Sequence, residues 1–339
     1  MSSSNPVLVD ALRGDMIESC HRGAAAVADV NGKLVAAWGD VEQPVFSRSA
    51  IKPVQALPLI ESGAADRFGL NDEEIALACA SHGAEPAHVE RLTRWLVRIG
   101  VNESDLECGP HLPLNEQASA DLLRSGQQPS PLHNNCSGKH AGFLTTAVHL
   151  GEPVRGYIRA EHPVQQRARR VLEEMSGADL TDAPAGIDGC GVPVVGLSLR
   201  ATARAMALLA CPEKLAPARA AAAARVLRAM TRQPFMVAGS GRFCTDVMRT
   251  GAAVAVKIGA EGAFTAALPG RCLGVALKID DGAGRAASVA MGAILQALGV
   301  LRRGVHEALA SHLRPRVRNH AGVVVGSLRP AAGWLESIR

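Results

Sequence analysis

The sequence predicts an α+β fold in which strands from both ends of the chain form one antiparallel sheet, flanked by helices and joined to a helical lobe. Three observations predict it. Apolar runs of strand length lie near both ends, helical periodicity dominates the middle, and Asn31-Gly32 separates the first two apolar runs as a hairpin turn does. Strands grouped at the ends with helices between them are typical of this architecture.

The N-terminal third contains the hairpin and the first helices. Its strands are predicted at Ala24–Val30 and Lys33–Trp38, and a helix starts within the run Ser47–Pro53. Glu73–Ala80 fits a helix or a strand and stops at Ser81-His82-Gly83, where the glycine interrupts the pattern. Residues 86–100 and 115–125 are predicted helices, since apolar residues recur on one face of the first.

The remainder of the chain returns from helices to strands. A Gly/Pro/Ser/Gln-rich connector at 126–131 leads into a helix that ends near residue 150. We expect further helices at 162–175, 196–210, 212–232 and 284–299, and strands at 252–258, 271–279 and near 323–325. The chain is thus one domain over 1–339, with a sheet lobe at about 7–48 and 250–330, a helical lobe at about 60–249, and a cleft between them.

Composition excludes several classes of protein. The 339 residues are 47% hydrophobic, 20% charged and 3% aromatic, which describes a soluble globular protein rich in helix. The net charge of +4 is spread thinly, and the single Tyr and six Phe offer few platforms for nucleic-acid bases. Residues 1–6 lack the regions of a signal peptide, and no run of about 18 apolar residues occurs. We therefore expect a cytoplasmic protein that binds neither nucleic acid nor membrane.

The eight cysteines do not follow the spacing of a disulfide scaffold. In a reducing compartment most cysteines are small buried hydrophobic residues, and the exceptions bind metal or react. The cysteines are Cys20, Cys79, Cys108, Cys136, Cys190, Cys211, Cys244 and Cys272.

The run Ser47–Pro53 places Ser49 and Lys52 three positions apart at a predicted helix start. Residues i and i+3 share a helix face with Cβ atoms about 5–6 Å apart, so the amine can reach the hydroxyl. A lysine becomes a base only when burial or nearby positive charge lowers its pKa, so this pair needs a partly buried cleft. A helix start also offers unpaired backbone N–H groups to a developing oxyanion.

A second group of unusual residues resembles a divided metal site. Cys136 precedes Lys139 and His140 at a predicted helix start, and Cys190 lies in a glycine-rich turn. Thiolates suit Zn²⁺, and three protein ligands leave one position for water or substrate. Chemistry alone favours Cys136, His140 and Cys190 as ligands, because neutral imidazole binds zinc readily. Two free cysteines buried in tight turns are the alternative explanation.

Five motifs together resemble the rhizobial-type (class 3, "asparaginase II") L-asparaginases, over about residues 7 to 327. They are Ser47–Pro53, Ala80–Gly83, His133–His140, Ile187–Gly191 and Gly239–Phe243. The resemblance implies a fold like that of serine β-lactamases and glutaminases, hydrolysis of L-asparagine to L-aspartate and ammonia, and a homodimer.

The resemblance also implies roles for individual residues. It pairs Ser49 with Lys52 and Ser81 with Lys257 as the catalytic set, and places Arg48, Asn135, His140 and Asp188 near substrate or metal. It gives Cys136, Lys139 and Cys190 as ligands of one Zn²⁺, with lysine in place of His140. We follow the resemblance here, because Zn²⁺ can itself hold an amine deprotonated.

Lys257 has support of its own from the sequence. Val254–Gly259 predicts a strand ending in Lys-x-Gly, comparable to the K-T-G of β-lactamases, with Ile258 in place of the hydroxyl residue. The missing hydroxyl argues against penicillins as substrates.

These residues suggest acyl transfer: Ser49 attacks the side-chain amide carbon, Lys52 and the Ser81–Lys257 pair relay the proton, and water hydrolyses the ester. The residues do not decide which lysine is the base, and zinc is expected to position the substrate. Two alternatives are a β-lactamase-like or peptidase-like amidase, which nitrocefin turnover would reveal, and a noncatalytic protein that binds zinc or an amino acid. Release of ammonia from asparagine separates the last from an enzyme.

Overall fold

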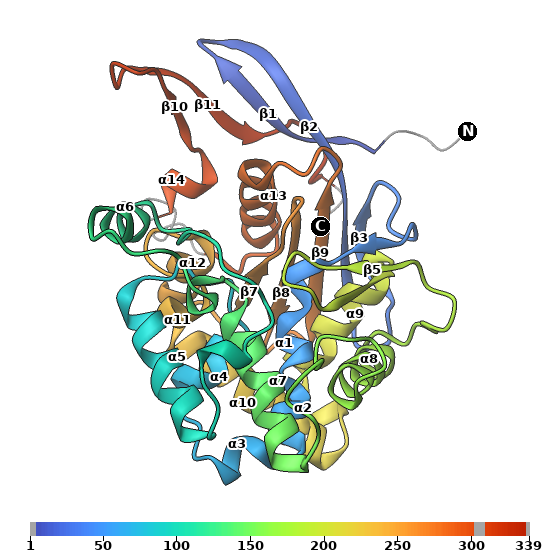
Figure 1. Ribbon diagram of the computed structural model, residues 1–339. Helices are drawn as coiled ribbons and strands as arrows, with labels where there is room; N and C mark the ends of the chain where they lie inside the picture. The colour runs from blue at the N-terminus through green and yellow to red at the C-terminus, as the bar shows by residue number, and fades with distance from the viewer. Residues whose placement is uncertain (1–4, 302–308, 337–339) are drawn as a thin grey trace.

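A computed structural model describes residues 5–301 and 309–336. The protein is α+β, and strands from both ends of the chain form its main sheet (Figure 1). All pairs in this sheet are antiparallel, in the order β10-β11-β1-β2-β9-β8-β7, with β3 paired to β2. Its strands are β1 (Val7–Arg13), β2 (Met16–Asp29), β3 (Leu34–Trp38), β7 (Ala255–Ile258), β8 (Ala263–Leu268), β9 (Leu273–Ile279), β10 (Arg316–Arg318) and β11 (Val324–Pro330).

The long strand β2 divides its side chains between two hydrophobic clusters. Ala24, Ala26 and Ala28 pack with α9 (Leu199–Ala210), whereas Ala25 and Val27 belong to the main core. Successive side chains of a strand point to opposite faces, so small alanines on one face let α9 lie close to the sheet. Helix α13 (Gly284–Ala297) packs against β1, β8, β9 and β11. The β1–β2 and β10–β11 hairpins extend beyond the helices at the top of Figure 1.

The helical lobe surrounds α7 (Ser137–Leu150), whose residues 137–147 are all buried. A small antiparallel sheet of order β4-β6-β5 lies beside it, formed by β4 (Val45–Phe46), β5 (Ala185–Ile187) and β6 (Pro193–Leu197). The other helices are α1 (Lys52–Gln55), α2 (Leu57–Glu61), α3 (Ala64–Arg67), α4 (Asp72–Ala78), α5 (Pro86–Arg98), α6 (Glu116–Arg124), α8 (Pro163–Ser176), α10 (Pro217–Arg232), α11 (Pro234–Ala238), α12 (Phe243–Arg249) and α14 (Ala310–Leu313).

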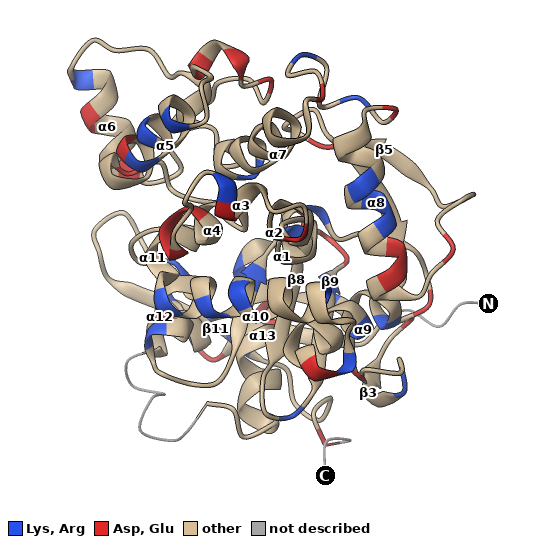
Figure 2. Cartoon of the chain, turned by 90° about the horizontal axis from the view of Figure 1, so that it is seen from below, with Lys and Arg blue, Asp and Glu red and all other residues tan. Residues whose placement is uncertain are grey.

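Charged residues of both signs are interspersed along the helices (Figure 2). Many of the arginines pair with carboxylates of neighbouring helices: on α10, Arg219 binds Glu61 and Arg225 binds Asp66. These ion pairs therefore connect neighbouring helices. In the described part of the chain, no helix has both the length and the apolar character needed to cross a membrane.

Most predicted elements are present, and the differences have physical reasons. The Asn31-Gly32 hairpin is confirmed, with Gly32 at a φ of 79° that favours glycine. The helix predicted at 196–210 begins at 199, because the preceding residues form β6, and the helix predicted at 212–232 begins at Pro217. The pattern did not indicate β1, β5, β8 or β10, since these short strands carry no turn signal as strong as Asn-Gly.

One pair of cysteines is bonded, whereas the sequence predicted free cysteines. Cys211 and Cys272 form a disulfide across 61 positions of sequence, although their spacing indicates no such pair. The remaining cysteines are free, and all of them except Cys20 are buried.

Candidate active site

Ser49 lies in a short 3-10 turn, η1 (Arg48–Ile51), which follows β4 and runs directly into α1. Arg48 has a φ of 48°, in the left-handed region that residues with a Cβ rarely adopt. The first hydrogen bond of the turn runs from the Ala50 N–H to the Ser47 carbonyl, at 3.0 Å. The N–H groups of Arg48 and Ser49 therefore have no acceptor within the turn, as at any helix start.

Neighbouring elements hold η1 from three sides. Ser47 Oγ lies 3.2 Å from Thr202 Oγ1 of α9, and Thr265 Oγ1 of β8 donates to the Ala50 carbonyl at 2.8 Å. The end of β7 comes closest, since a Cβ on Gly259 would lie 2.7 Å from the Ser47 carbonyl oxygen. Glycine at this position therefore lets the strand that carries Lys257 end against the turn.

The two predicted catalytic lysines meet at Ser81. Lys257 Nζ donates to Ser81 Oγ at 2.8 Å, and Lys52 Nζ donates to the same oxygen at 3.2 Å. Lys52 also donates to the Ala80 carbonyl and, at 3.2 Å, to Cys136 Sγ. Both lysines are almost completely buried. The structure thus places the Ser81 hydroxyl between two buried amines.

The hydrogen bond expected between Lys52 and Ser49 is absent. Within residues 5–301 and 309–336, the Ser49 hydroxyl has no hydrogen-bond partner, and the residue is 8% exposed. The 3-10 geometry of η1 explains part of this difference, because the expectation assumed a continuous α-helix. Bonds between catalytic groups often tighten only when substrate is bound.

Lys257 is electrostatically suited to accept a proton. Burial lowers its pKa to about 7, and the nearby Lys52 acts in the same direction. Both causes disfavour the charged form of an amine. About half of the Lys257 side chains are therefore neutral near pH 7, as a general base requires.

The predicted metal ligands converge beside this cluster. Lys139 Nζ donates to Cys190 Sγ at 3.1 Å, and the Cys136 thiol is hydrogen-bonded to Cys190. All three side chains are at least nine-tenths buried. Cys136 also contacts Lys52, so this trio adjoins the Ser81–lysine cluster.

The hydrogen bond from Cys136 and the charge of Lys139 lower the pKa of Cys190 to about 5, although burial opposes them. Cys190 is therefore a thiolate at neutral pH. Two sulfur donors, one of them ionised, together with a buried amine form a donor set that suits Zn²⁺.

His140, the alternative ligand, is held by a different partner. Its Nδ1 lies 2.7 Å from the hydroxyl of Tyr157, and that hydroxyl accepts the Glu107 N–H at 2.9 Å. A tyrosine hydrogen directed at His140 Nδ1 would leave the imidazole hydrogen on Nε2, and in that tautomer Nε2 cannot bind a metal. Lys139 would likewise have to lose a proton to bind one, because the neighbouring sulfurs and Asp188 raise its pKa although burial opposes them. Among the described residues, Nε2 has no hydrogen-bond partner and is buried.

Of the expected substrate residues, Arg48 of η1 and Asp188 are paired with each other. Arg48 Nε donates to Asp188 Oδ1 at 2.7 Å, and the charge of Lys139 and this bond lower the pKa of Asp188 against the effect of burial. Arg48, Lys139 and Asp188 line a cavity of about 460 Å³ between α8 and the small sheet. Asn135 uses its backbone N–H to bind His111 Nε2 at 2.9 Å. Within the described ranges its carboxamide makes no hydrogen bond.

Sequence reasoning missed several residues that position the site. Tyr157 orients His140, while Thr202 and Thr265 hold the two ends of η1. Tyr157 is the single tyrosine of the chain, and that rarity is the one local signal available. The two threonines lie in ordinary helix and strand patterns.

Comparisons with known proteins agree with the motifs. Residues 9–330 match the model of a protein family described as L-asparaginase II. No protein of curated function matches the sequence significantly.

Several solved structures are similar to the chain. A β-lactamase from Mycobacterium bovis is 15% identical, with a TM-score of 0.41; the match covers 81% of this chain and 94% of that one. A crystal structure of Mglu in its glutamate form is 17% identical, with a TM-score of 0.38, over 82% of this chain and 61% of that one.

Proposed function

The chain belongs to the L-asparaginase II family, and on that premise we propose that it hydrolyses L-asparagine to L-aspartate and ammonia through an acyl-enzyme on Ser49. Family membership supports an amidohydrolase of the asparaginase type. The choice of L-asparagine and the serine mechanism are our proposals.

One observation carries the mechanism: the Ser81 hydroxyl accepts hydrogen bonds from two buried lysines, at 2.8 and 3.2 Å. Two buried ammonium groups so close to one hydroxyl repel each other, which favours a neutral amine at one of them. The pKa of about 7 for Lys257 supports that lysine as the amine that is neutral near pH 7.

In this mechanism the proton is transferred along the side chains of Lys52, Ser81 and Lys257. The Ser49 oxygen attacks the amide carbon, and its proton passes through Lys52 and Ser81 to Lys257. The same groups return the proton to the amide nitrogen, the C–N bond breaks, and ammonia leaves. Water, deprotonated by the same amine, attacks the ester, and the proton returns to Ser49 as aspartate forms. The free N–H groups of Arg48 and Ser49 are available to the oxyanion.

Zinc fits the trio of Cys136, Lys139 and Cys190, and we propose one Zn²⁺ per chain there. The fit rests on the buried donor set and on the ionised Cys190. When bound, the ion would supply fixed positive charge that positions the substrate. His140 would donate a hydrogen bond from Nε2 to the substrate. In the Arg48–Asp188 pair, the guanidinium would attract the carboxylate of a zwitterionic amino acid and the aspartate would attract its ammonium group.

We further propose that the enzyme is a homodimer and works in the cytoplasm. The first proposal follows from the family resemblance. The second follows from the composition and from the spacing of the cysteines, which is not that of a disulfide scaffold.

Release of ammonia from L-asparagine by zinc-loaded protein is the decisive experiment. We expect turnover of asparagine and none of nitrocefin. Ser49→Ala should lower kcat by roughly 10³-fold or more with an unchanged thermal midpoint, because the nucleophile is lost. No ammonia from the parent protein would refute the proposal. Near-normal turnover by Ser49→Ala, or an acyl adduct trapped on Ser81, would refute the role of Ser49.

A further inference from the structure

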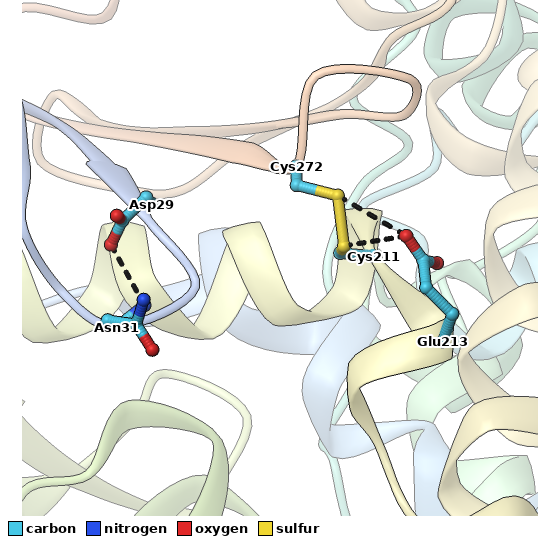
Figure 3. Close-up of a disulfide and its surroundings, with 5 residues drawn as sticks. All are labelled: Asp29, Asn31, Cys211, Glu213 and Cys272. Atoms are coloured by element: carbon cyan, nitrogen blue, oxygen red, sulfur yellow. Dashed lines mark hydrogen bonds between the residues drawn. A yellow bond between two sulfur atoms is a disulfide. The ribbon is translucent and has the colours of Figure 1, made fainter.

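The Cys211–Cys272 pair lies outside the active site and joins the end of α9 to the turn between β8 and β9 (Figure 3). Cys211 follows the last turn of α9 and is fully buried. Cys272 lies in the turn between β8 and β9 and is partly exposed. Of the two residues, only Cys272 is therefore accessible to solvent.

Glu213 lies beside both sulfurs, as Figure 3 shows. Its Oε1 is 2.9 Å from Cys211 Sγ and 3.5 Å from Cys272 Sγ. A disulfide sulfur carries no hydrogen, so a hydrogen bond does not explain this approach in the oxidised form. In the reduced form the carboxylate would face thiols, and its negative charge would oppose their ionisation.

The backbone at Cys272 points to a functional side chain. Its φ is 52°, in the region that favours glycine, and a turn between two strands would ordinarily place glycine there. Cysteine does not ease this conformation, so its presence there calls for another reason, and the bond to Cys211 supplies one. This observation is independent of the position of Glu213.

We infer that Cys211 and Cys272 form an exchangeable redox site that reacts with low-molecular-weight thiols and disulfides, and that Glu213 slows this exchange. Disulfides in reducing compartments are mostly of this exchanging kind. That argument uses the cytoplasmic location proposed above, whereas the experiment below does not depend on it.

The exchange consists of two thiol–disulfide steps in which atoms and electrons are conserved. A thiolate attacks the exposed Cys272 sulfur, the Cys211–Cys272 bond breaks, and Cys211 leaves as a thiolate that takes up a proton. A second thiolate then attacks the small-molecule sulfur of this mixed disulfide, so that Cys272 is released and also protonated. The pair gains two electrons, and two small thiols become one disulfide. Glu213 repels both the incoming and the leaving thiolate, so it raises the barrier of each step, while the protonated thiols that result carry no charge for it to repel.

The cross-link encloses catalytic parts of the chain. Residues 211–272 include α10, α11, α12 and β7, and β7 carries Lys257. Reduction would therefore remove a constraint from the segment that delivers a catalytic amine, without altering any group in the active site. We expect the reduced protein to unfold at a lower temperature than the oxidised protein.

The test equilibrates the parent protein and Glu213→Gln in glutathione buffers of varied thiol-to-disulfide ratio, traps free thiols with N-ethylmaleimide, and locates them by peptide mass spectrometry. We expect Cys211 and Cys272 to change together and reversibly. In Glu213→Gln the rate of reduction after a shift to reducing buffer, followed by the same trapping, should rise by about 3- to 10-fold, less at high salt. Glu90→Gln on α5, a surface glutamate that binds Arg94, is the matched control and should match the parent.

Three results would overturn the inference. The first is that both cysteines remain labelled as free thiols in the most oxidising buffer. The second is a rate of reduction in Glu213→Gln equal to that of the parent. The third is that the reduced protein takes up a second Zn²⁺ that Cys272→Ser loses, since that would make Cys211, Glu213 and Cys272 a metal site.

Discussion

Lys257 shows how a single side chain acquires its chemistry from burial. The environment lowers its pKa to about 7, so the amine is neutral in the upper part of the physiological range. A base must be neutral to act, so kcat/KM should rise as pH increases through about 7 and level off above it.

The measurement is the pH profile of kcat/KM for L-asparagine in the parent and in Lys257→Arg. Guanidinium stays protonated above pH 12, so this variant should be nearly inactive at every pH. Lys278→Arg, a half-buried lysine on β9, should keep the parental profile. An active Lys257→Arg with an unchanged profile would make Lys52 the base.

Tyr157 is a second example at the residue scale, because its hydroxyl is expected to set which nitrogen of His140 carries the hydrogen. Tyr157→Phe removes the group that binds both His140 Nδ1 and the Glu107 N–H, so either imidazole nitrogen can then carry the hydrogen. We expect kcat/KM to fall about 10- to 100-fold and the free energy of unfolding to fall by about 1–3 kcal/mol, because buried polar groups lose their partner.

Histidine ¹⁵N spectra report the tautomer directly, and the Nε2–H pattern of His140 should be lost in Tyr157→Phe. Phe143→Leu is the control, since Phe143 packs edge-on against His140 without a hydrogen bond. If the spectrum of Tyr157→Phe kept the Nε2–H pattern, Tyr157 would not orient the ring.

At the scale of elements, the close approach of β7 to η1 positions the catalytic groups. In Gly259→Ala the new Cβ would lie 2.7 Å from the Ser47 carbonyl oxygen and 3.1 Å from the Ala50 nitrogen. Both are backbone atoms, so the strand end or the turn must move. We expect kcat to fall by roughly 100-fold, since a displacement near 1 Å is enough for such a loss.

Steady-state kinetics and thermal unfolding of Gly259→Ala and Gly284→Ala provide the comparison. Gly284 begins α13 and has no atom within 4 Å of a built Cβ, so its alanine variant should keep full activity and stability. Equal activity of Gly259→Ala and the parent would show that the contact between β7 and η1 has no catalytic role.

At the scale of the whole molecule, zinc would connect segments that are distant in sequence. Cys136 and Lys139 lie at the start of α7, and Cys190 follows β5. We expect about one Zn²⁺ per chain, loss of most of it in Cys190→Ser, and a lower thermal midpoint after chelation, because a bound metal stabilises the folded form.

Elemental analysis of purified variants measures this occupancy. Cys20→Ser, which removes an exposed thiol, should retain the metal. His140→Ala should retain it as well if Nε2 carries a hydrogen. Metal retained in Cys190→Ser but lost in His140→Ala would instead make His140 a ligand.

The sequence by itself determined the features that depend on neighbours within about ten positions. Turn chemistry at Asn31-Gly32 and helical periodicity predicted most helices, and clustering of strands at the chain ends predicted the α+β class. The motifs also suggested Ser49 and Lys52 and, through the family resemblance, the trio of Cys136, Lys139 and Cys190; their roles stay predictions.

Only the tertiary structure decided how distant groups act on one another. Ser81 and Lys257 are 176 positions apart, and their 2.8 Å hydrogen bond and the pKa of Lys257 depend on burial that no local pattern encodes. The sequence likewise could not predict the Cys211–Cys272 pair or the contact between His140 and Tyr157, since each depends on which elements pack together. Local spacing determines backbone conformation, whereas desolvation and long-range hydrogen bonds, which set reactivity, exist only once the chain is folded.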